Sequence, residues 1–185
     1  GFRYLLEKSD IDVAGRKCVI LGSGGASKTV SVVLQDLGAK EILEVSRTGE
    51  INYENIKECG DAEIIVNSTP VGMFPNNMKS LINLDDFPGC IGVVDLIYNP
   101  NRTKLILDAM ERGIPAVSGL GMLVAQGFKA SELFQGKELD SEEISIAIEE
   151  IRDVTLNRIL IGMPGAGKTF LGMKMAEATG REFVD

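Results

Sequence analysis

The chain has 185 residues, 44% of them hydrophobic and 25% charged, with a formal net charge of −8. This length accommodates one full domain with an appendage. The acidic balance excludes non-specific binding to nucleic acid or to an anionic membrane, because phosphate groups attract clustered Lys and Arg. The sequence contains no histidine, which excludes a Ser-His-Asp triad and histidine-based proton transfer within the chain.

No apolar stretch reaches the ~18 residues that would span a bilayer. The first residues do not resemble a signal peptide and do not start with Met, so we interpret Gly1 as an internal cut in a cytoplasmic protein. Cys18, Cys59 and Cys90 lie far apart and form no CxxC pair. This spacing predicts small buried thiols in a reducing compartment and no metal site.

Short apolar runs alternate with segments of helical spacing along residues 1–150. The runs predict strands at residues 18–21, 42–45, 64–66, 92–97 and 114–117. The helical spacing predicts one helix that ends at Gly38 and others at residues 53–58, 103–112, 122–133 and 141–151. Alternating strands and helices indicate an α/β fold, a Rossmann-like, doubly wound and mainly parallel sheet with C-terminal helices.

The pattern restarts near Asn157. A strand is expected at residues 158–161, then a second glycine loop and a helix that ends at Thr179, and residues 182–184 begin another strand. We therefore expect a first domain over residues 1–152 and a truncated P-loop strand–helix segment over residues 157–185.

A glycine-rich stretch, GSGGAS at residues 22–27, lies between the first expected strand and its helix. Glycine lets the backbone turn tightly and approach phosphate groups, and a helix start offers free N–H donors and the positive end of a dipole. The spacing departs from GxGxxG, because Ser27 stands where the third glycine would be. The setting suits a dinucleotide pyrophosphate; a plain strand-to-helix turn is the alternative.

The end of the second expected strand indicates which dinucleotide is bound. Rossmann-type sites place the ribose selector here, an acidic residue for a free 2′-hydroxyl or an Arg for a 2′-phosphate. The sequence reads Ser46, Arg47, Thr48, and Glu44 falls one strand alternation too early to reach the same pocket. This favours NADP over NAD, and a solvated arginine at a strand end is the alternative.

Four stretches resemble motifs of the shikimate dehydrogenases. They are SRT at residues 46–48, NSTPVGM at residues 67–73, DLIYNP at residues 95–100 and GLGMLVAQ at residues 119–126. They occur in the order of that family and cover nearly all of residues 1–150. The resemblance implies an NADP-dependent oxidoreductase that interconverts 3-dehydroshikimate and shikimate in the shikimate pathway of aromatic amino-acid biosynthesis.

The resemblance also implies roles for single residues. The pyrophosphate would be cradled by Gly22, Ser23, Gly24, Gly25 and Ala26. The adenosine 2′-phosphate would be held by Ser46, Arg47 and Thr48. The nicotinamide half would be contacted by Leu96 and Gly119, with Met122 packed near the ring. The substrate, shikimate or 3-dehydroshikimate, would be reached by Tyr98 and Gln126. Hydride would pass between NADPH and the 3-keto group of 3-dehydroshikimate.

The sequence departs from the family pattern in two places. Ser46 replaces the first residue of the NRT motif, and Ile51 stands where a second basic residue is expected, which leaves one Arg for the 2′-phosphate. The family's catalytic Lys and Asp lie upstream, the Asp in a segment that ends in Gly-Phe, and this chain opens with Gly1 and Phe2. No residue here matches that pair, so we name no catalytic residue.

The second glycine loop, GMPGAGKT at residues 162–169, matches GxxxxGK[ST] at every position. Backbone N–H groups of such a loop cradle phosphates, its Lys neutralises phosphate oxygens and its Thr binds Mg²⁺. The residues expected to bind ATP and Mg²⁺ are therefore Gly162, Gly165, Gly167, Lys168 and Thr169. The continuation to the end of the chain resembles the start of shikimate kinases, which implies a bifunctional dehydrogenase–kinase.

Other functions stay open from the sequence. A related NADP reductase, such as a glutamyl-tRNA reductase, shares the domain type, and Tyr98 and Gln126 in their motifs argue against it. A non-catalytic nucleotide-binding regulatory module is a second alternative, because the chain holds no assigned proton donor. A third alternative makes the loop at residues 162–169 the main functional site.

Overall fold

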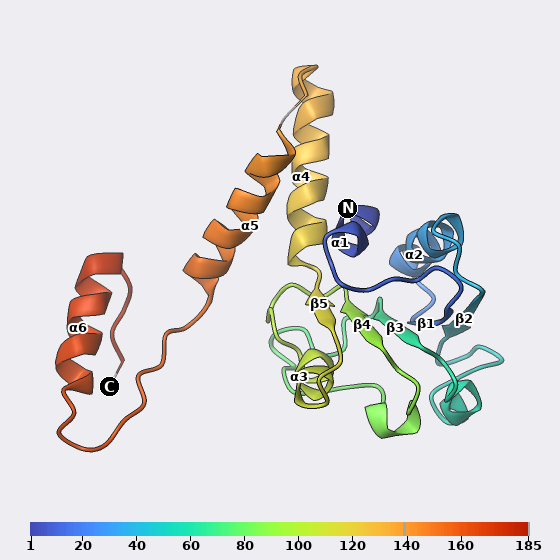
Figure 1. Cartoon of the computed structure of the whole chain (residues 1–185), viewed down its shortest axis with the longest axis horizontal. Helices are drawn as coiled ribbons and strands as arrows, with labels where there is room; N and C mark the ends of the chain where they lie inside the picture. The colour runs from blue at the N-terminus through green and yellow to red at the C-terminus, as the bar shows by residue number, and fades with distance from the viewer. Residues whose placement is uncertain (139, 185) are drawn as a thin grey trace. The chain divides into compact units, whose positions relative to one another are not determined.

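The computed structural model describes residues 1–138 and 140–184 of the chain. The chain divides into two compact units, Gly1–Ile148 and Glu149–Asp185, which are described separately. Within the described residues, the first unit forms a five-stranded parallel sheet with the order β2-β1-β3-β4-β5 (Figure 1). The strands are β1 (Lys17–Leu21), β2 (Glu41–Val45), β3 (Ile64–Asn67), β4 (Gly92–Asp95) and β5 (Ala116–Ser118). The α/β fold with a parallel sheet is confirmed.

The strand order reverses between β1 and β3. From β1 the chain passes outward to β2, then returns to β3 on the other side of β1 and continues to β4 and β5. The strands end in register, with Leu21 opposite both Val45 and Asn67, and Asn67 opposite Asp95. The loops that follow the strands therefore share one edge of the sheet. Sheets of this kind bind ligands outside the carboxyl ends of the strands, at the reversal point.

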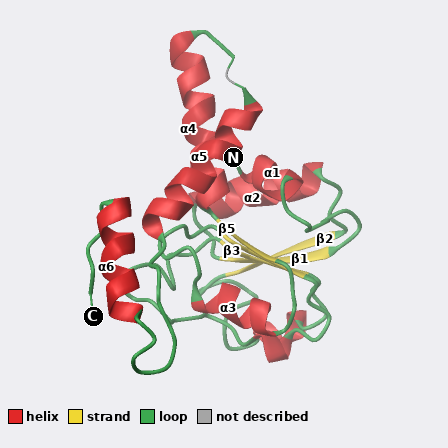
Figure 2. Ribbon diagram, turned by 60° about the vertical axis from the view of Figure 1, so that its left-hand side comes forward, coloured by secondary structure: helices red, strands yellow, loops and turns green. Residues whose placement is uncertain are grey.

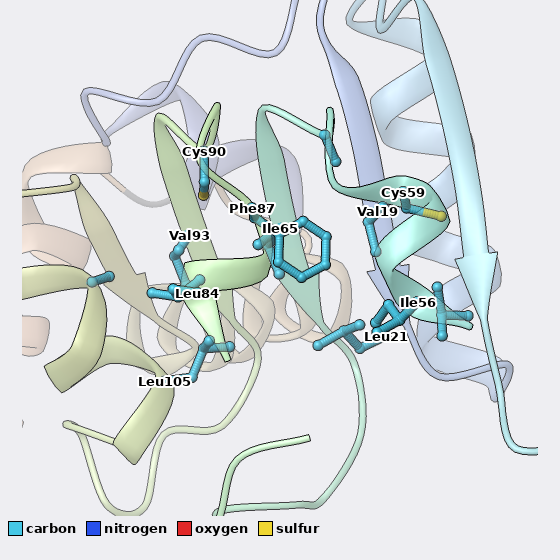
Figure 3. Packing of buried hydrophobic residues seen from close by; sticks show 13 residues of the cluster. Val19, Leu21, Ile56, Cys59, Ile65, Leu84, Phe87, Cys90, Val93 and Leu105 are labelled. Atoms are coloured by element: carbon cyan, nitrogen blue, oxygen red, sulfur yellow. The ribbon is translucent and has the colours of Figure 1, made fainter. Parts of the chain in front are cut away.

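Helices cover both faces of the sheet (Figure 2), because successive strand residues point to opposite sides. Cys18 and Ile20 of β1 pack in one layer and Val19 and Leu21 pack in the other. Figure 3 shows the layer of Val19 and Leu21, where Phe87 lies among the buried side chains.

Different helices contribute to the two layers. The layer of Cys18 and Ile20 includes helices α1 (Phe2–Glu7) and α2 (Gly25–Asp36). The layer of Val19 and Leu21 includes the short turns η1 (Ile56–Cys59) and η2 (Leu84–Asp86) and helix α3 (Lys104–Glu111).

The cysteines lie inside these layers. Cys18 belongs to the layer of α1 and α2, and Cys59 and Cys90 belong to the opposite layer; all three are buried free thiols. Burial raises the pKa of the Cys18 thiol to about 12. A protonated thiol is a poor nucleophile and a poor metal ligand. The predicted buried thiols are confirmed, and the described residues contain no cluster of three or more side chains suited to a metal ion.

Helix α1 is not predicted by the apolar spacing. Its Phe2, Leu5 and Leu6 are buried, and it packs against α4 (Leu120–Gln135). Gly121 makes this approach close, because a β-carbon there would lie 3.2 Å from a methyl group of Leu5. Helix α5 (Ser141–Thr155) follows α4, so the expected C-terminal helices are present. None of the described helices is long and apolar enough to cross a membrane.

Two expected elements of the first unit are wrong in part. The helix predicted at residues 53–58 is only the short turn η1. Asn52 accepts a hydrogen bond from the backbone N–H of Glu54, and Asn55 accepts one from the N–H of Asn52, so the backbone there follows side-chain turns instead of a helix. The strand predicted at residues 92–97 ends at Asp95, whose carboxylate accepts the N–H of Ile97.

The second unit contains α6 (Lys168–Thr179), which ends before Gly180 as expected. The strands predicted at residues 158–161 and 182–184 are wrong, because neither segment forms a strand. A strand needs a neighbouring strand for its backbone hydrogen bonds, and no sheet is found among the described residues of this unit. Several apolar side chains are accordingly exposed, among them Ile159, Ile161 and Phe170, whose exposed fractions are 79%, 92% and 71%.

Candidate nucleotide-binding site

The first glycine loop lies at the carboxyl end of β1, beside the point where the strand order reverses. Gly22 has a φ of 110°, a backbone conformation that side chains rarely allow. Its N–H donates to the carbonyl oxygen of Val45 over 2.8 Å. A β-carbon on Gly22 would lie 2.8 Å from the hydroxyl oxygen of Ser68 and 2.9 Å from a methyl carbon of Thr69. The loop is thus held between the ends of β2 and β3, and only glycine fits its first position.

The rest of this loop is open to a ligand. Ser23, Gly24, Gly25 and Ala26 are exposed, and a β-carbon on either glycine would meet no atom within 4 Å. Helix α2 begins after Gly24, and no side chain caps the N–H groups of its first turn beside the loop. An uncapped helix start of this kind suits an anion such as a pyrophosphate.

Ser27 occupies the position of the third glycine in the GxGxxG spacing. It is fully buried, and its hydroxyl donates to the carbonyl oxygen of Gly24 over 2.6 Å. A small side chain with this internal hydrogen bond replaces glycine without leaving a buried polar atom unpaired. The departure from the spacing is therefore compatible with a nucleotide loop.

The expected ribose selector lies at the end of the neighbouring strand β2. The N–H of Ser46 donates to the carbonyl oxygen of Ile51, which closes a turn over residues 46–51. Arg47 and Thr48 are exposed on this turn, and Arg47 forms no ion pair with any described residue. Burial raises the pKa of Tyr53, and the positive charge of Arg47 opposes that rise. The guanidinium group of Arg47 is accordingly available for an anion beside the glycine loop.

Leu96 and Gly119 meet at the far side of the same edge. A β-carbon on Gly119 would lie 2.0 Å from the carbonyl oxygen of Leu96, and the N–H of Gly119 donates to the carbonyl oxygen of Ile97 over 3.0 Å. The structure thus joins two residues that are expected to contact one ligand half. Met122, in the first turn of α4, is partly buried against the core.

The two expected substrate residues follow β4 and β5, on the loop after β4 and on α4. Tyr98 follows β4 and is 49% exposed, and Gln126 is exposed on α4, one turn beyond Met122. Among the described residues, no hydrogen bond joins the side chains of Tyr98 and Gln126. The Gln126 side chain lies beside Gly1, where a β-carbon would be 2.6 Å from its γ-carbon.

A buried polar network joins the ends of β3 and β4. Asn67 donates from its side-chain nitrogen to one carboxylate oxygen of Asp95 over 3.0 Å, and Thr103 donates from its hydroxyl to the other over 2.7 Å. All three residues are at most 3% exposed. Burial raises the pKa of Asp95, and its hydrogen bonds with Thr103, Ile97 and Asn67 oppose the rise.

Asn67 and Asp95 lie in two of the family-like stretches, and the sequence alone predicts no role for either. The available signal is that each polar residue closes an otherwise apolar buried strand, since Asn67 ends β3 and Asp95 ends β4. Burying such groups is costly unless they are hydrogen-bonded. Polar residues at these positions therefore indicate partners in the loops that follow.

The second glycine loop belongs to the second unit and precedes α6. Gly165 and Gly167 have φ values of 80° and 79°, so both need glycine. The Lys168 ammonium donates to the carbonyl oxygens of Gly162 and Met163, each over 2.8 Å, and thereby folds back over the loop. A cavity of about 660 Å³ lies within this unit between α6 and the segments on either side; its lining includes Leu160, Lys168, Thr169, Met175 and Phe183.

No protein-family model matches the chain. A curated shikimate dehydrogenase (NADP(+)) of Methanopyrus kandleri is 39% identical over 174 residues, which cover 81% of this chain and 60% of that protein. The Clostridium perfringens protein of the same name is 32% identical over 165 residues, 82% of this chain and 61% of that protein. The chain thus spans about three fifths of the length of these curated relatives.

A solved structure extends the similarity to the fold. The crystal structure of a chorismate mutase/shikimate 5-dehydrogenase fusion protein from Clostridium acetobutylicum superimposes with a TM-score of 0.78 at 32% sequence identity. The match covers 83% of this chain and 60% of that chain. The Rossmann-like fold predicted from the strand and helix pattern is therefore shared with a protein that carries this dehydrogenase.

Proposed function

We propose that residues 1–152 are the NADP-binding domain of a shikimate dehydrogenase, an oxidoreductase that interconverts 3-dehydroshikimate and shikimate. One observation carries the proposal: the four family-like stretches begin at or directly after the ends of β2, β3, β4 and β5 and so gather at one edge of the sheet. That edge also holds the glycine loop and an uncapped helix start. Curated relatives named shikimate dehydrogenase (NADP(+)) support the family and the cofactor.

The residues at this edge fit NADP part by part. The N–H groups at the start of α2 and the open backbone of Gly24 and Gly25 would hold the pyrophosphate, and Arg47 would pair with the 2′-phosphate. The backbone of Leu96 and Gly119 would receive the nicotinamide half, with Met122 beside it. When bound, the cofactor supplies or accepts the hydride.

Tyr98 and Gln126 would hydrogen-bond the polyhydroxylated substrate from the edge of this domain. We assign no proton donor to the chain. The motifs matched here contain no counterpart of the family's Lys and Asp.

Residues 157–185 we propose as the start of a shikimate kinase, which would make the parent protein bifunctional and give this loop ATP and Mg²⁺ as ligands. The spacing at residues 162–169 and the left-handed glycines Gly165 and Gly167 support a phosphate-binding loop. The relatives reported above are named as dehydrogenases, so this second proposal depends on the loop and on the resemblance of the residues after it.

The test of the first proposal is calorimetric titration of the full chain with NADP⁺ and with NAD⁺ at fixed salt. Saturable binding that is tighter for NADP⁺ is expected. No binding of either nucleotide would sink the proposal. Equal binding of both would leave a dinucleotide domain and remove the assigned selectivity. The part of a relative that this chain does not cover can then be joined to the chain. Shikimate oxidation by the resulting fusion distinguishes the dehydrogenase from a regulatory module or a glutamyl-tRNA reductase.

A further inference from the structure

The buried network of Asn67, Asp95 and Thr103 extends into each loop that borders the expected nicotinamide position. On the β3 side, the side-chain oxygen of Asn67 accepts hydrogen bonds from the N–H of Thr69 over 3.0 Å and from the Thr69 hydroxyl over 2.7 Å. The Thr69 hydroxyl in turn accepts the N–H of Val71 over 3.2 Å. The loop after β3 is thus fixed from Asn67 onward by side chains instead of by a regular element.

On the β4 side, the same carboxylate fixes a second loop. One oxygen of Asp95 accepts the N–H of Ile97 over 3.0 Å, and Thr103 caps α3 by accepting the N–H of Ile106 over 3.3 Å. Ile97 then accepts the N–H of Gly119 through its carbonyl oxygen. Asp95 is therefore linked through Ile97 to Gly119, which packs on Leu96.

The network comes close to the glycine loop at one point, through a methyl group and without a hydrogen bond between Thr69 and Gly22. Thr69, which Asn67 holds by two hydrogen bonds, places its methyl carbon 2.9 Å from the position of a Gly22 β-carbon. The loops after β3 and β4 are thus connected through the buried side chains of Asn67 and Asp95, and the partly buried Thr69 brings them close to the loop after β1. Asp95 is 0% exposed, so it does not touch a ligand at the surface of the site.

We infer that Asp95, with Asn67 and Thr103, is a positioning residue that holds the loops after β3 and β4 in the arrangement required by the nicotinamide half of the dinucleotide. This inference rests on the proposed NADP site and specifies which residues shape one half of it. The adenosine half depends instead on the glycine loop and on Arg47, which lie at the ends of β1 and β2. Loss of the network accordingly affects one half of the ligand and spares the other.

The experiment compares Thr103→Val, which keeps the shape and removes the hydroxyl, with Thr103→Ser, which keeps the hydroxyl. Each full chain is titrated calorimetrically with NADP⁺ and with adenosine 2′,5′-bisphosphate, the half of NADP that lacks the nicotinamide. In the parent chain we expect NADP⁺ to bind more tightly than the bisphosphate. Thr103→Val is expected to weaken NADP⁺ about tenfold and to leave the bisphosphate within about twofold, whereas Thr103→Ser stays near the parent for both.

A matched control separates positioning from stability. Val93→Ala removes buried volume from the same strand as Asp95, on the side of the α3 layer, and is expected to lower the thermal midpoint without changing the ratio of the two affinities. The inference is overturned if Thr103→Val leaves the ratio of the two affinities unchanged, whether or not both affinities fall. It is also overturned if the parent chain binds both ligands equally tightly. A parent chain that binds neither ligand would instead contradict the proposed function.

Asp95→Ala and Asp95→Asn extend the comparison. Ala removes every acceptor, and Asn keeps one oxygen for Asn67 and Ile97, so we expect the NADP⁺ affinity of the Asn variant to lie between those of the parent and the Ala variant. If the Ala variant does not fold, the Thr103 pair still decides. An Asn variant as weak as the Ala variant, with Thr103→Val unaffected, would assign the effect to charge and contradict the hydrogen-bonded network.

Discussion

Gly119 packs so closely on Leu96 that a β-carbon would lie 2.0 Å from the Leu96 carbonyl oxygen and 2.5 Å from its carbonyl carbon. Gly119 has right-handed helical backbone angles, so the constraint is one of space and not of φ. The contact fixes the entry of α4 against the end of β4. It therefore links the start of the helix that carries Met122 and Gln126 to the loop that carries Tyr98.

Gly119→Ala is expected to destabilise the chain by about 1–3 kcal/mol, because the new methyl group overlaps backbone atoms that cannot rotate away. It should also weaken NADP⁺, since Leu96 must shift. Gly127→Ala in the same helix is the control: a β-carbon there meets no atom within 4 Å, and we expect it to stabilise by about 0.5–1 kcal/mol. Urea unfolding measures the free energy of unfolding of the two variants. A Gly119→Ala chain as stable as the parent would contradict the close contact.

Arg47→Ala is expected to weaken NADP⁺ by about 1.5–3 kcal/mol, the size of a charge-assisted contact, and hardly to change NAD⁺. Arg47 is the basic residue of the turn after β2. Lys40→Ala is the charge-matched control, because Lys40 is exposed immediately before the amino end of β2. Calorimetry at fixed salt provides the dissociation constants. An equal loss for both dinucleotides would remove Arg47 from the 2′-phosphate site.

The 185-residue chain alone is expected not to oxidise shikimate at a useful rate. We assign no proton-transfer residue to it, and binding a cofactor without a proton acceptor does not complete the reaction. The assay follows NADPH formation at saturating shikimate and NADP⁺. Turnover within about tenfold of a typical ~10 s⁻¹ enzyme would show that the proton-transfer group lies inside this chain.

Stability should depend on pH through Asp95. Burial raises its pKa in the folded chain, so the folded state binds that proton more tightly than the unfolded state, whose Asp pKa is about 3.9. The contribution of Asp95 therefore favours folding at low pH and is lost as pH rises through the folded pKa. The Asp95→Asn chain has no titrating carboxyl group at this position. The difference in stability between it and the parent therefore removes the contributions of the other carboxylates.

The measurement is urea unfolding of both chains at several values between about pH 4 and pH 7. We expect the stability of the parent relative to Asp95→Asn to decline as pH rises. A rise over the same range would mean that the hydrogen bonds of Thr103, Ile97 and Asn67 outweigh burial.

The second unit is expected to bind ATP weakly and to transfer no phosphoryl group. Its loop has the required glycines, yet α6 has no buried residue and no sheet among the described residues of this unit holds the loop in place. Ordering backbone costs about 1–2 kcal/mol per residue, and so few buried groups do not offset this.

Hydrogen exchange over residues 158–184, with and without Mg-ATP, tests this expectation, with Lys168→Ala as the binding-deficient reference. Fast exchange that ATP leaves unchanged is expected. Strong protection that deepens with nucleotide in the parent and not in Lys168→Ala would make this segment a working nucleotide site.

The elements around β1 could be predicted because their signals are local. An apolar run followed by GSGGAS and then by helical spacing indicates strand, loop and helix within about twenty residues. The expected helix at residues 53–58 failed because Asn52 and Asn55 bind nearby backbone groups, which apolar spacing does not reveal. The expected strands at residues 158–161 and 182–184 failed because a strand depends on a neighbour that a sequence window does not supply.

Some residues of the candidate site could likewise be predicted from local signals, and others could not. Gly22 and Arg47 are identified by their distance from an expected strand end. The pairing of Asn67 with Asp95 joins residues that are 28 positions apart, and the contact of Gly119 with Leu96 arises only when β4 and β5 lie side by side. Such contacts follow from the order of strands in the sheet, which the sequence pattern restricts to an architecture without determining each neighbour.

The three buried cysteines can report when the helices and turns of each layer separate from the sheet. Cys18 reports on the layer of α1 and α2, and Cys59 and Cys90 report on the layer of α3. A thiol reagent reaches each sulfur only when its layer separates from the sheet, because all three are buried in the folded chain. Labelling followed by mass analysis would therefore distinguish a chain that opens one layer at a time from one that opens both together, without any added probe.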